Sequence, residues 1–153
     1  MLYLIRHADA VDLHPDHARP LSDRGREQVK TLAKFLERSE AFSPDEIWHS
    51  SLVRARETAE LLAKALKFPG SCREVAGLRP EDNANDIARK LAKLEGSVAL
   101  VGHEPQMSSL ATLLVVGATE PAAFVMKKGA TLALDRGLDR WIVRWHIAPG
   151  LLG

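Results

Sequence analysis

The chain has 153 residues, which is the length of one ordinary domain and enough to bury a hydrophobic core. Apolar residues make up 46% of it and charged residues 27%, which is the balance of a globular protein and not of a disordered or fibrous one. Lys and Arg number 21 against 20 Asp and Glu, so the net charge of +1 argues against nucleic acid or a membrane surface as a partner, although it is compatible with a small, local cluster of Arg.

The N-terminal part of the chain predicts two strands and a helix. Residues 2–5 are an apolar run with aromatic and β-branched members, which is typical of a buried strand. Ser22 or Asp23 can cap a following helix, whose apolar side chains recur on one face. That face carries Val29, Leu32, Ala33 and Leu36. Residues 46–49 are predicted to form the second strand.

The middle of the chain continues this alternation. A helix is predicted over residues 52–66, where Ala and Leu recur at core-facing spacing until a Pro-Gly pair ends the pattern. Residues 73–75 are predicted to form a short edge strand, and residues 85–94 a helix. Residues 97–101 are predicted to form a central strand.

The C-terminal part predicts one more helix and a hairpin. The helix covers residues 105–116, with a proline in its first turn and a glycine directly after it. Strands are predicted over residues 124–126, 131–135 and 141–147. The last two are joined by a hairpin loop over residues 136–139.

Alternating strands and helices indicate a layered α/β fold with a largely parallel sheet. The terminal hairpin adds antiparallel strands, so that the sheet becomes mixed. We therefore expect a three-layer sandwich, in which helices cover both faces of a mixed, mostly parallel sheet. No repeat or linker divides the chain, and we expect a single domain over residues 1–153.

The sequence also indicates a compartment. Cys72 is the only cysteine, which excludes an intramolecular disulfide and favours a reducing environment. The apolar run at the N-terminus is too short for a signal peptide, and the apolar stretch over residues 110–118 is too short to cross a bilayer. We expect a cytoplasmic protein.

Unusual polar residues follow three of the predicted strands. Arg6 and His7 leave the first strand, a segment ending in Arg54 leaves the second, and His103 leaves the central one. Ligands of open α/β sheets bind beyond the carboxyl ends of the strands. If these strands are parallel neighbours, the four side chains meet at one edge of the sheet.

Two imidazoles and two guanidiniums in one place are suited to binding and attacking a phosphoryl group. Arginine offers planar, bidentate donors that keep their charge, and a helix N-terminus adds free N–H groups. A neutral imidazole nitrogen can attack phosphorus and form a phosphohistidine, which splits one difficult step into two. The neighbouring Arg groups are expected to hold the pKa of His7 down and keep it neutral.

Each residue also has a plainer interpretation when it is taken alone. His103 is compatible with a helix-capping or core histidine, and Arg54 with a solvated helix residue paired with Glu57. The order of these residues and their shared place at strand ends favour a site over these alternatives.

The motifs resemble those of a known superfamily. Residues 4–10, Leu-Ile-Arg-His-Ala-Asp-Ala, resemble the signature of the histidine phosphatases, which have the phosphoglycerate mutase-like fold. Residues 19–25 and 50–59 are similar to the following segments of that family, and Val-Gly-His at residues 101–103 is similar to its second histidine motif. The short chain and the form of the first motif look most like the phosphohistidine phosphatases of the SixA type.

The resemblance implies a function and a set of roles. It implies His7 as the nucleophile that carries a covalent phosphoryl group, with Arg6, Arg19, Arg54 and His103 around that group. It implies a phosphohistidine phosphatase that acts on a phosphorylated protein and needs no cofactor. Two alternatives stay open: a phosphatase of small phosphomonoesters, and a non-catalytic phosphate-binding module.

The sequence departs from the wider superfamily in two places. The usual Arg-His-Gly has become Arg-His-Ala, and no carboxylic general acid can be placed by a clear motif. Asp16, Glu81 and Asp82 are the candidates for that acid, but the composition favours a solvated loop carboxylate for each, and none is assigned the role. We expect no metal, because Arg6 and Arg54 would repel a dication placed near His7 and His103.

Overall fold

The structure is a computed structural model that describes residues 1–152. Its strands are β1 (Leu2–Arg6), β2 (Glu46–His49), β3 (Ser71–Glu74), β4 (Val98–Gly102), β5 (Thr131–Arg136) and β6 (Trp141–Ile147). Its helices are α1 (Asp23–Ser39), α2 (Val53–Ala65), α3 (Ala84–Ala92) and α4 (Gln106–Val116), with short 3₁₀ turns η1 (Asp16–Ala18) and η2 (Pro149–Leu151). Within residues 1–152 no helix is long and apolar enough to span a bilayer.

The six strands form one mixed sheet in the order β3-β2-β4-β1-β5-β6. The pairings among β3, β2, β4 and β1 are parallel, whereas β5 is antiparallel to β1 and to β6. Arg6 pairs with Gly102, and His49 pairs with Val101, so β1, β4 and β2 end at the same edge of the sheet. The expected three-layer α/β sandwich with a mixed sheet is confirmed.

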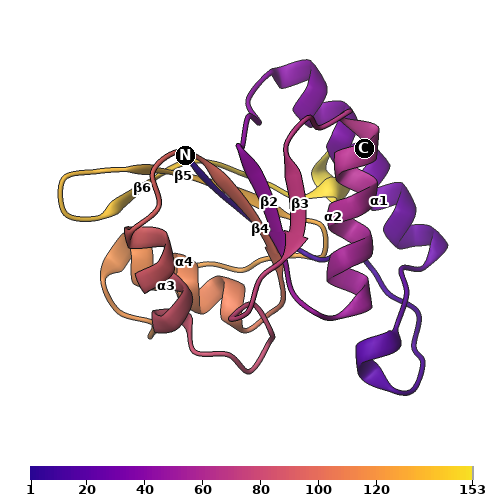
Figure 1. Cartoon of the computed structure of the whole chain (residues 1–153), viewed down its shortest axis with the longest axis horizontal. Helices are drawn as coiled ribbons and strands as arrows, with labels where there is room; N and C mark the ends of the chain where they lie inside the picture. Colours follow the sequence, from indigo (N-terminus) through magenta and orange to yellow (C-terminus); the bar gives the residue numbers. More distant parts are fainter. Residues whose placement is uncertain (153) are drawn as a thin grey trace.

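Helices cover both faces of the sheet, with α1 and α2 on one side and α3 and α4 on the other (Figure 1). The side chains of β1 alternate between the two layers: Leu2 and Leu4 pack in the core beneath α3 and α4, and Tyr3 and Ile5 pack in the core beneath α1 and α2. Because both faces are covered, every position of this strand up to Ile5 is apolar.

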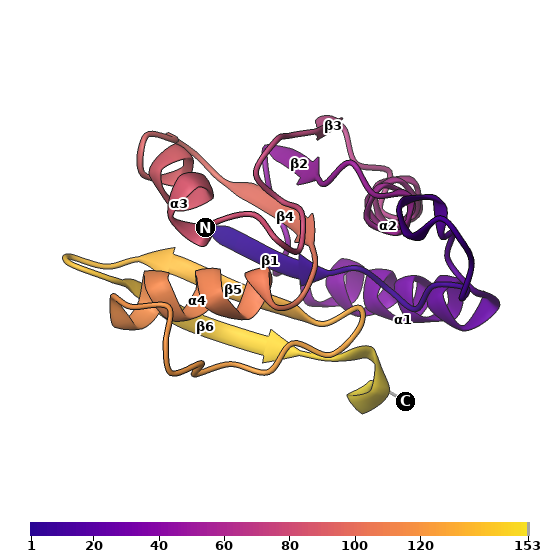
Figure 2. The same ribbon diagram turned by 90° about the horizontal axis from the view of Figure 1, so that it is seen from below.

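Helix α1 begins as its sequence indicated and positions the loop that follows β1. The Ser22 hydroxyl caps it by accepting a hydrogen bond from the Gly25 amide at 3.0 Å. A Cβ atom at Gly25 would collide with the Asp9 carbonyl, so only glycine lets α1 approach this closely. The rest of the loop carries η1 outward, where it lies beside α2 (Figure 2).

Two expected strands differ from the structure. Phe124 to Met126 form no strand, because β5 already occupies the sheet position beside β1. The backbone at the two ends of this region is bonded to side chains instead: the amide of Ala123, directly before the segment, donates to Thr112 Oγ1, and the Met126 carbonyl accepts from Arg6. The edge strand expected over residues 73–75 is β3, which begins at Ser71 and pairs with β2 in parallel.

Candidate active site

The aligned strand ends bring two histidines together. The His7 amide donates to the Gly102 carbonyl at 2.9 Å, which ties the end of β1 to the end of β4. The ring centroids of His7 and His103 lie 5.0 Å apart. Both side chains are buried, with exposed fractions of 6% for His7 and 1% for His103. The two imidazoles therefore face a common space at the carboxyl edge of the sheet.

The hydrogen bonds of His7 determine which of its nitrogens is free. Nδ1 lies 2.7 Å from the Ala8 carbonyl, and because a carbonyl can only accept, the ring proton is on Nδ1. Burial lowers the pKa of His7 to about 4, and the charges of Arg54 and Arg6 add to that effect, although the hydrogen bond to Ala8 opposes it. At neutral pH His7 is thus uncharged, with an unshared electron pair on Nε2.

His103 has the opposite arrangement of partners. Its Nε2 lies 2.6 Å from Ser50 Oγ, which also accepts a hydrogen bond from the Leu52 amide. The Ser50 hydroxyl has no other acceptor among residues 1–152, so it donates to Nε2 and leaves the ring proton of His103 on Nδ1. Burial lowers the pKa of His103 to about 3, and the nearby His7 and Arg54 contribute. Nδ1 is buried and has no hydrogen-bond partner in the described part of the chain.

Two guanidiniums complete the group of buried donors. Arg6 donates through Nη1 to the Met126 carbonyl at 2.9 Å, and Arg54 donates through Nη1 to the Asp16 carbonyl at 3.0 Å. The Nε atoms of both residues are buried, and neither has an acceptor within residues 1–152. Buried donors are almost always satisfied in folded proteins, so three unsatisfied ones near a neutral imidazole indicate an anion site.

Arg54 also occupies the first turn of α2, where the positive end of the helix dipole lies. The plainer interpretation of this residue, an ion pair with Glu57, is wrong. Glu57 instead accepts a hydrogen bond from the Leu21 amide at 2.8 Å, while Arg54 is 6% exposed and faces the turn η1.

Asp16 connects the two arginines on this side. Its carboxylate lies 3.3 Å from Arg54 Nη2 and 3.2 Å from Arg19 Nη1. Burial by itself would raise the pKa of Asp16, but the hydrogen bond from Arg19 and the charge of Arg54 outweigh it and hold that pKa below its ordinary value. Arg19 donates its Nε to the Val11 carbonyl, so its guanidinium holds the loop as well as the carboxylate.

The other two candidate acids make their hydrogen bonds and ion pairs locally. Glu81 pairs with Arg79 at 3.2 Å and is largely exposed, and Asp82 accepts a hydrogen bond from the Arg79 amide at 2.9 Å. Of the three carboxylates considered, Asp16 is the one bonded to a guanidinium of the site.

Sequence analysis missed Lys128 and the role of Ser50. Lys128 lies in the loop before β5, pairs with Asp9 at 2.8 Å, and contributes to the lowered pKa of His7. The next residue, Gly129, donates its amide to the Arg6 and His7 carbonyls. Only the antiparallel pairing of β5 with β1 brings this loop to the site, and a distant Lys-Lys-Gly in the sequence gives no sign of that pairing.

Comparison with known proteins finds a matching family model and a related sequence. A family model for the histidine phosphatase superfamily (branch 1) matches residues 2–82. An uncharacterised protein of Picosynechococcus sp. is 32% identical over 146 residues, which cover 91% of this chain and 87% of that protein.

Solved structures agree with this chain over nearly its whole length. The protein histidine phosphatase SixA complexed with tungstate has a TM-score of 0.86 at 23% identity, with 99% of each chain covered. A SixA-type protein from Agrobacterium tumefaciens, described as a putative phosphohistidine phosphatase, has a TM-score of 0.81 at 24% identity, with 97% of each chain covered. A putative alpha-ribazole-5'-P phosphatase from Escherichia coli has a TM-score of 0.79 at 19% identity, covering 97% of this chain and 96% of that one. These likenesses confirm the expected phosphoglycerate mutase-like fold.

Proposed function

The chain belongs to the histidine phosphatase superfamily, and we propose that it is a metal-independent phosphatase whose substrate is a phosphohistidine on another protein. The observation that carries this proposal is the pairing of a neutral His7, whose Nε2 is free, with three buried donors that have no acceptor within residues 1–152. Those donors are Nε of Arg6, Nε of Arg54 and Nδ1 of His103.

In the proposed first step, Nε2 of His7 attacks the phosphorus atom of the bound phosphohistidine. The substrate's imidazole is protonated on its other nitrogen, so when the bond between phosphorus and the imidazole nitrogen breaks, the ring takes the electron pair and leaves as neutral imidazole. Arg6, Arg54 and His103 donate hydrogen bonds to the phosphoryl oxygens, where charge spreads during transfer. The Nδ1–H bond to the Ala8 carbonyl keeps His7 in the attacking tautomer throughout.

In the second step, water attacks the phosphoryl group on His7. The bond between phosphorus and Nε2 breaks, the oxygen of water stays on phosphorus, and inorganic phosphate leaves with the protons. His7 returns to its neutral form with Nε2 free, ready for the next cycle.

The donor set supports a mechanism that uses arginine in place of a metal. Within residues 1–152 no group of three or more His, Cys, Asp or Glu side chains is placed to hold a metal ion. The fixed charges of Arg6 and Arg54 supply the stabilisation that a dication supplies elsewhere, and they would repel one.

The state of Asp16 favours phosphohistidine over alkyl phosphates. An alkoxide leaving group has a conjugate acid with a pKa of about 15–16, near that of water, and needs a proton in the transition state. A histidine leaving group departs as neutral imidazole once its free ring nitrogen is protonated, and the parent pKa of roughly 6.5 makes that protonation easy near neutrality without a strong acid in the site. Asp16, held ionised by Arg19 and Arg54, is poorly suited to donate a proton.

A second candidate function, hydrolysis of small phosphomonoesters, has one observation in its favour. A phosphate dianion bound beside Arg54 would compete for the cation that now pairs with Asp16. The pKa of that carboxyl would then rise, and Asp16 would become a possible general acid.

Measured kcat/KM values for a phosphohistidine peptide and a panel of sugar and alcohol phosphates distinguish the two functions. The proposal requires a value at least about a hundredfold higher for the peptide, the lower estimate for a general acid's contribution. Equal rates on an alkyl phosphate, lost in Asp16→Asn, would instead establish the second candidate.

A further inference from the structure

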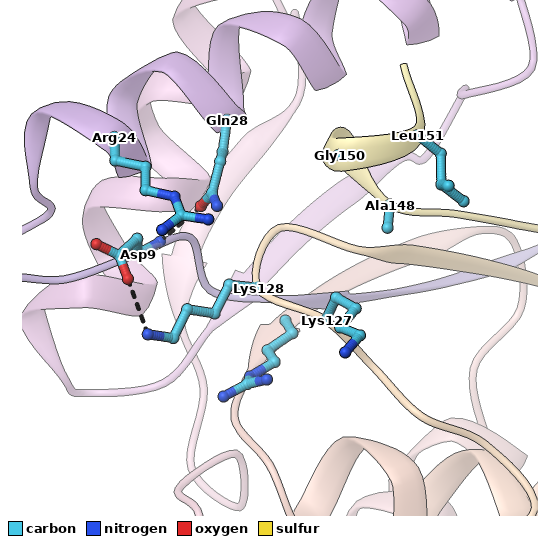
Figure 3. Close-up of a pocket in the computed structure, with 9 residues that line it drawn as sticks. Asp9, Arg24, Gln28, Lys127, Lys128, Ala148, Gly150 and Leu151 are labelled. Atoms are coloured by element: carbon cyan, nitrogen blue, oxygen red, sulfur yellow. Dashed lines mark hydrogen bonds and ion pairs between the residues drawn. The ribbon is translucent and has the colours of Figure 1, made fainter. Parts of the chain in front are cut away.

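A second pocket lies beside the candidate active site and shares Arg6 with it. Its volume is about 550 Å³. The pocket is bounded by α1, by the loop before β5 and by the C-terminal segment around η2 (Figure 3). Arg6 directly precedes His7, and Asp9, which also lines the pocket, follows two residues later. A group bound in this pocket is therefore a close neighbour of the phosphoryl site.

The pocket is strongly cationic although the whole chain has a net charge of only +1. Arg6, Arg24, Lys127 and Lys128 line it against a single carboxylate, that of Asp9. That carboxylate is already held by Lys128 at 2.8 Å and by the Ser22 hydroxyl at 2.7 Å. Figure 3 shows Lys128 directed at Asp9.

Arg24 and Lys127 are different, because neither forms an ion pair in the described part of the chain. They come from separate elements, α1 and the loop before β5, and both are exposed to solvent. The charge of Arg24 helps to lower the pKa of Asp9, which is itself held by Lys128. Two cations on opposite sides of one pocket that form no ion pair within residues 1–152 are placed to receive an anion from outside the protein.

We propose that this pocket binds a carboxylate of the substrate, and that the enzyme thereby selects phosphohistidines that have an acidic side chain beside them. This inference rests on the function proposed above. The wall of the pocket formed by the C-terminal segment indicates that the carboxylate belongs to a protein. Ala148 and Leu151 add apolar surface there, next to the cations, which another protein can contact. Leu151 is 79% exposed, so this wall is open to contact from another protein.

Two phosphohistidine peptides test the proposal. They are identical except that the residues flanking the phosphohistidine are Glu in one and Gln in the other. We expect kcat/KM to be roughly tenfold higher for the Glu peptide, mainly through KM, which corresponds to about 1.4 kcal/mol. The preference should shrink as salt is added, because the cations concerned are exposed.

Two matched double variants distinguish an effect of the pocket on this preference from an effect of the protein's overall charge. Arg24→Gln combined with Lys127→Gln should bring the ratio of kcat/KM for the Glu peptide to that for the Gln peptide close to one. It should leave kcat/KM for the Gln peptide unchanged. Lys30→Gln combined with Lys93→Gln removes the same charge from exposed positions that do not line the pocket, and should keep the preference. A preference that survives in the first double variant would overturn the proposal.

The remaining outcomes separate this inference from the proposed function. Equal kcat/KM for the two peptides would overturn the inference and leave phosphohistidine hydrolysis standing. Failure to hydrolyse either peptide would overturn the proposed function itself. A second pair of substrates, phenyl phosphate and 3-carboxyphenyl phosphate, tests small molecules in the same way. If kcat/KM is higher for the carboxylate in this pair but not in the peptide pair, the assignment to a protein substrate is overturned.

Discussion

Ser50 Oγ lies 2.6 Å from Nε2 of His103, and both side chains are buried. The same oxygen accepts a hydrogen bond from the Leu52 amide, so Ser50 connects the start of α2 to the histidine that follows β4. Because Nε2 of His103 is occupied in this way, its ring proton lies on Nδ1, which has no partner within residues 1–152. Ser50 thus determines which nitrogen of His103 can donate to a bound phosphoryl group.

Ser50→Ala should lower kcat roughly tenfold with little effect on KM, since leaving a buried polar atom unsatisfied costs about 1–3 kcal/mol and frees His103 to change tautomer. Nitrogen chemical shifts of His103 should report proton placement on Nδ1 in the parent protein and a mixture of tautomers in the variant. The exposed neighbour offers a control, Ser51→Ala, which should change neither quantity. An unchanged tautomer in Ser50→Ala would show that Ser50 does not position His103.

The titration of His7 provides a second prediction. Its pKa falls from 6.5 to about 4 on folding, so between these values the unfolded chain binds a proton that the folded protein does not. The free energy of unfolding should therefore decrease as the pH is lowered from 6.5 towards 4, and His7→Gln should weaken that dependence. Denaturant unfolding across this pH range measures the effect. An NMR titration that finds His7 charged near pH 6.5 would contradict the burial argument.

Much of this architecture follows from local patterns in the sequence. The apolar run of β1 and the serine cap of α1 are evident from neighbouring residues, and the rule that ligands bind at strand ends predicts the proximity of His7 and His103. Phe124 to Met126 has the composition of a strand, but whether it joins the sheet depends on β5 occupying the place beside β1. The local sequence of a segment does not indicate long-range strand pairing of this kind.

Contacts within the site likewise could not be predicted from local sequence. The charge of Lys128 acts on His7 only because β5 pairs with β1, and the tautomer of His103 depends on a contact between residues 53 positions apart. The ion pair of Asp16 with Arg54 likewise depends on how the loop after β1 folds against α2. Residue types and strand ends indicated phosphoryl chemistry, whereas the protonation of each group required the three-dimensional contacts.

Arg54→Ala should weaken the binding of tungstate or vanadate by about ten- to a hundredfold, since each charge-assisted hydrogen bond contributes roughly 1.5–3 kcal/mol. Isothermal titration calorimetry measures the change directly. The control is Arg56→Ala, because Arg56 lies on the same helix but pairs with Glu60 at 3.8 Å and is largely exposed. Equal losses in the two variants would mean that overall charge, and not the site, governs anion binding.

Extensive chelation should leave the rate of hydrolysis unchanged, because Arg6 and Arg54 supply the positive charge at the phosphoryl group. The measurement compares kcat/KM for a phosphohistidine peptide before and after dialysis against a strong chelator. Activity lost on dialysis and restored by zinc or magnesium alone would contradict the metal-independent mechanism.

The measurement closest to the central claim is the identification of the residue that carries the phosphoryl group. Rapid quench with labelled substrate should trap an acid-labile, base-stable phosphate on His7, and mass spectrometry of the quenched protein should locate it there. His7→Ala should abolish both the label and turnover while the circular dichroism spectrum stays unchanged. A label on Ser50 or Ser51, or turnover that persists in His7→Ala, would contradict the proposed mechanism.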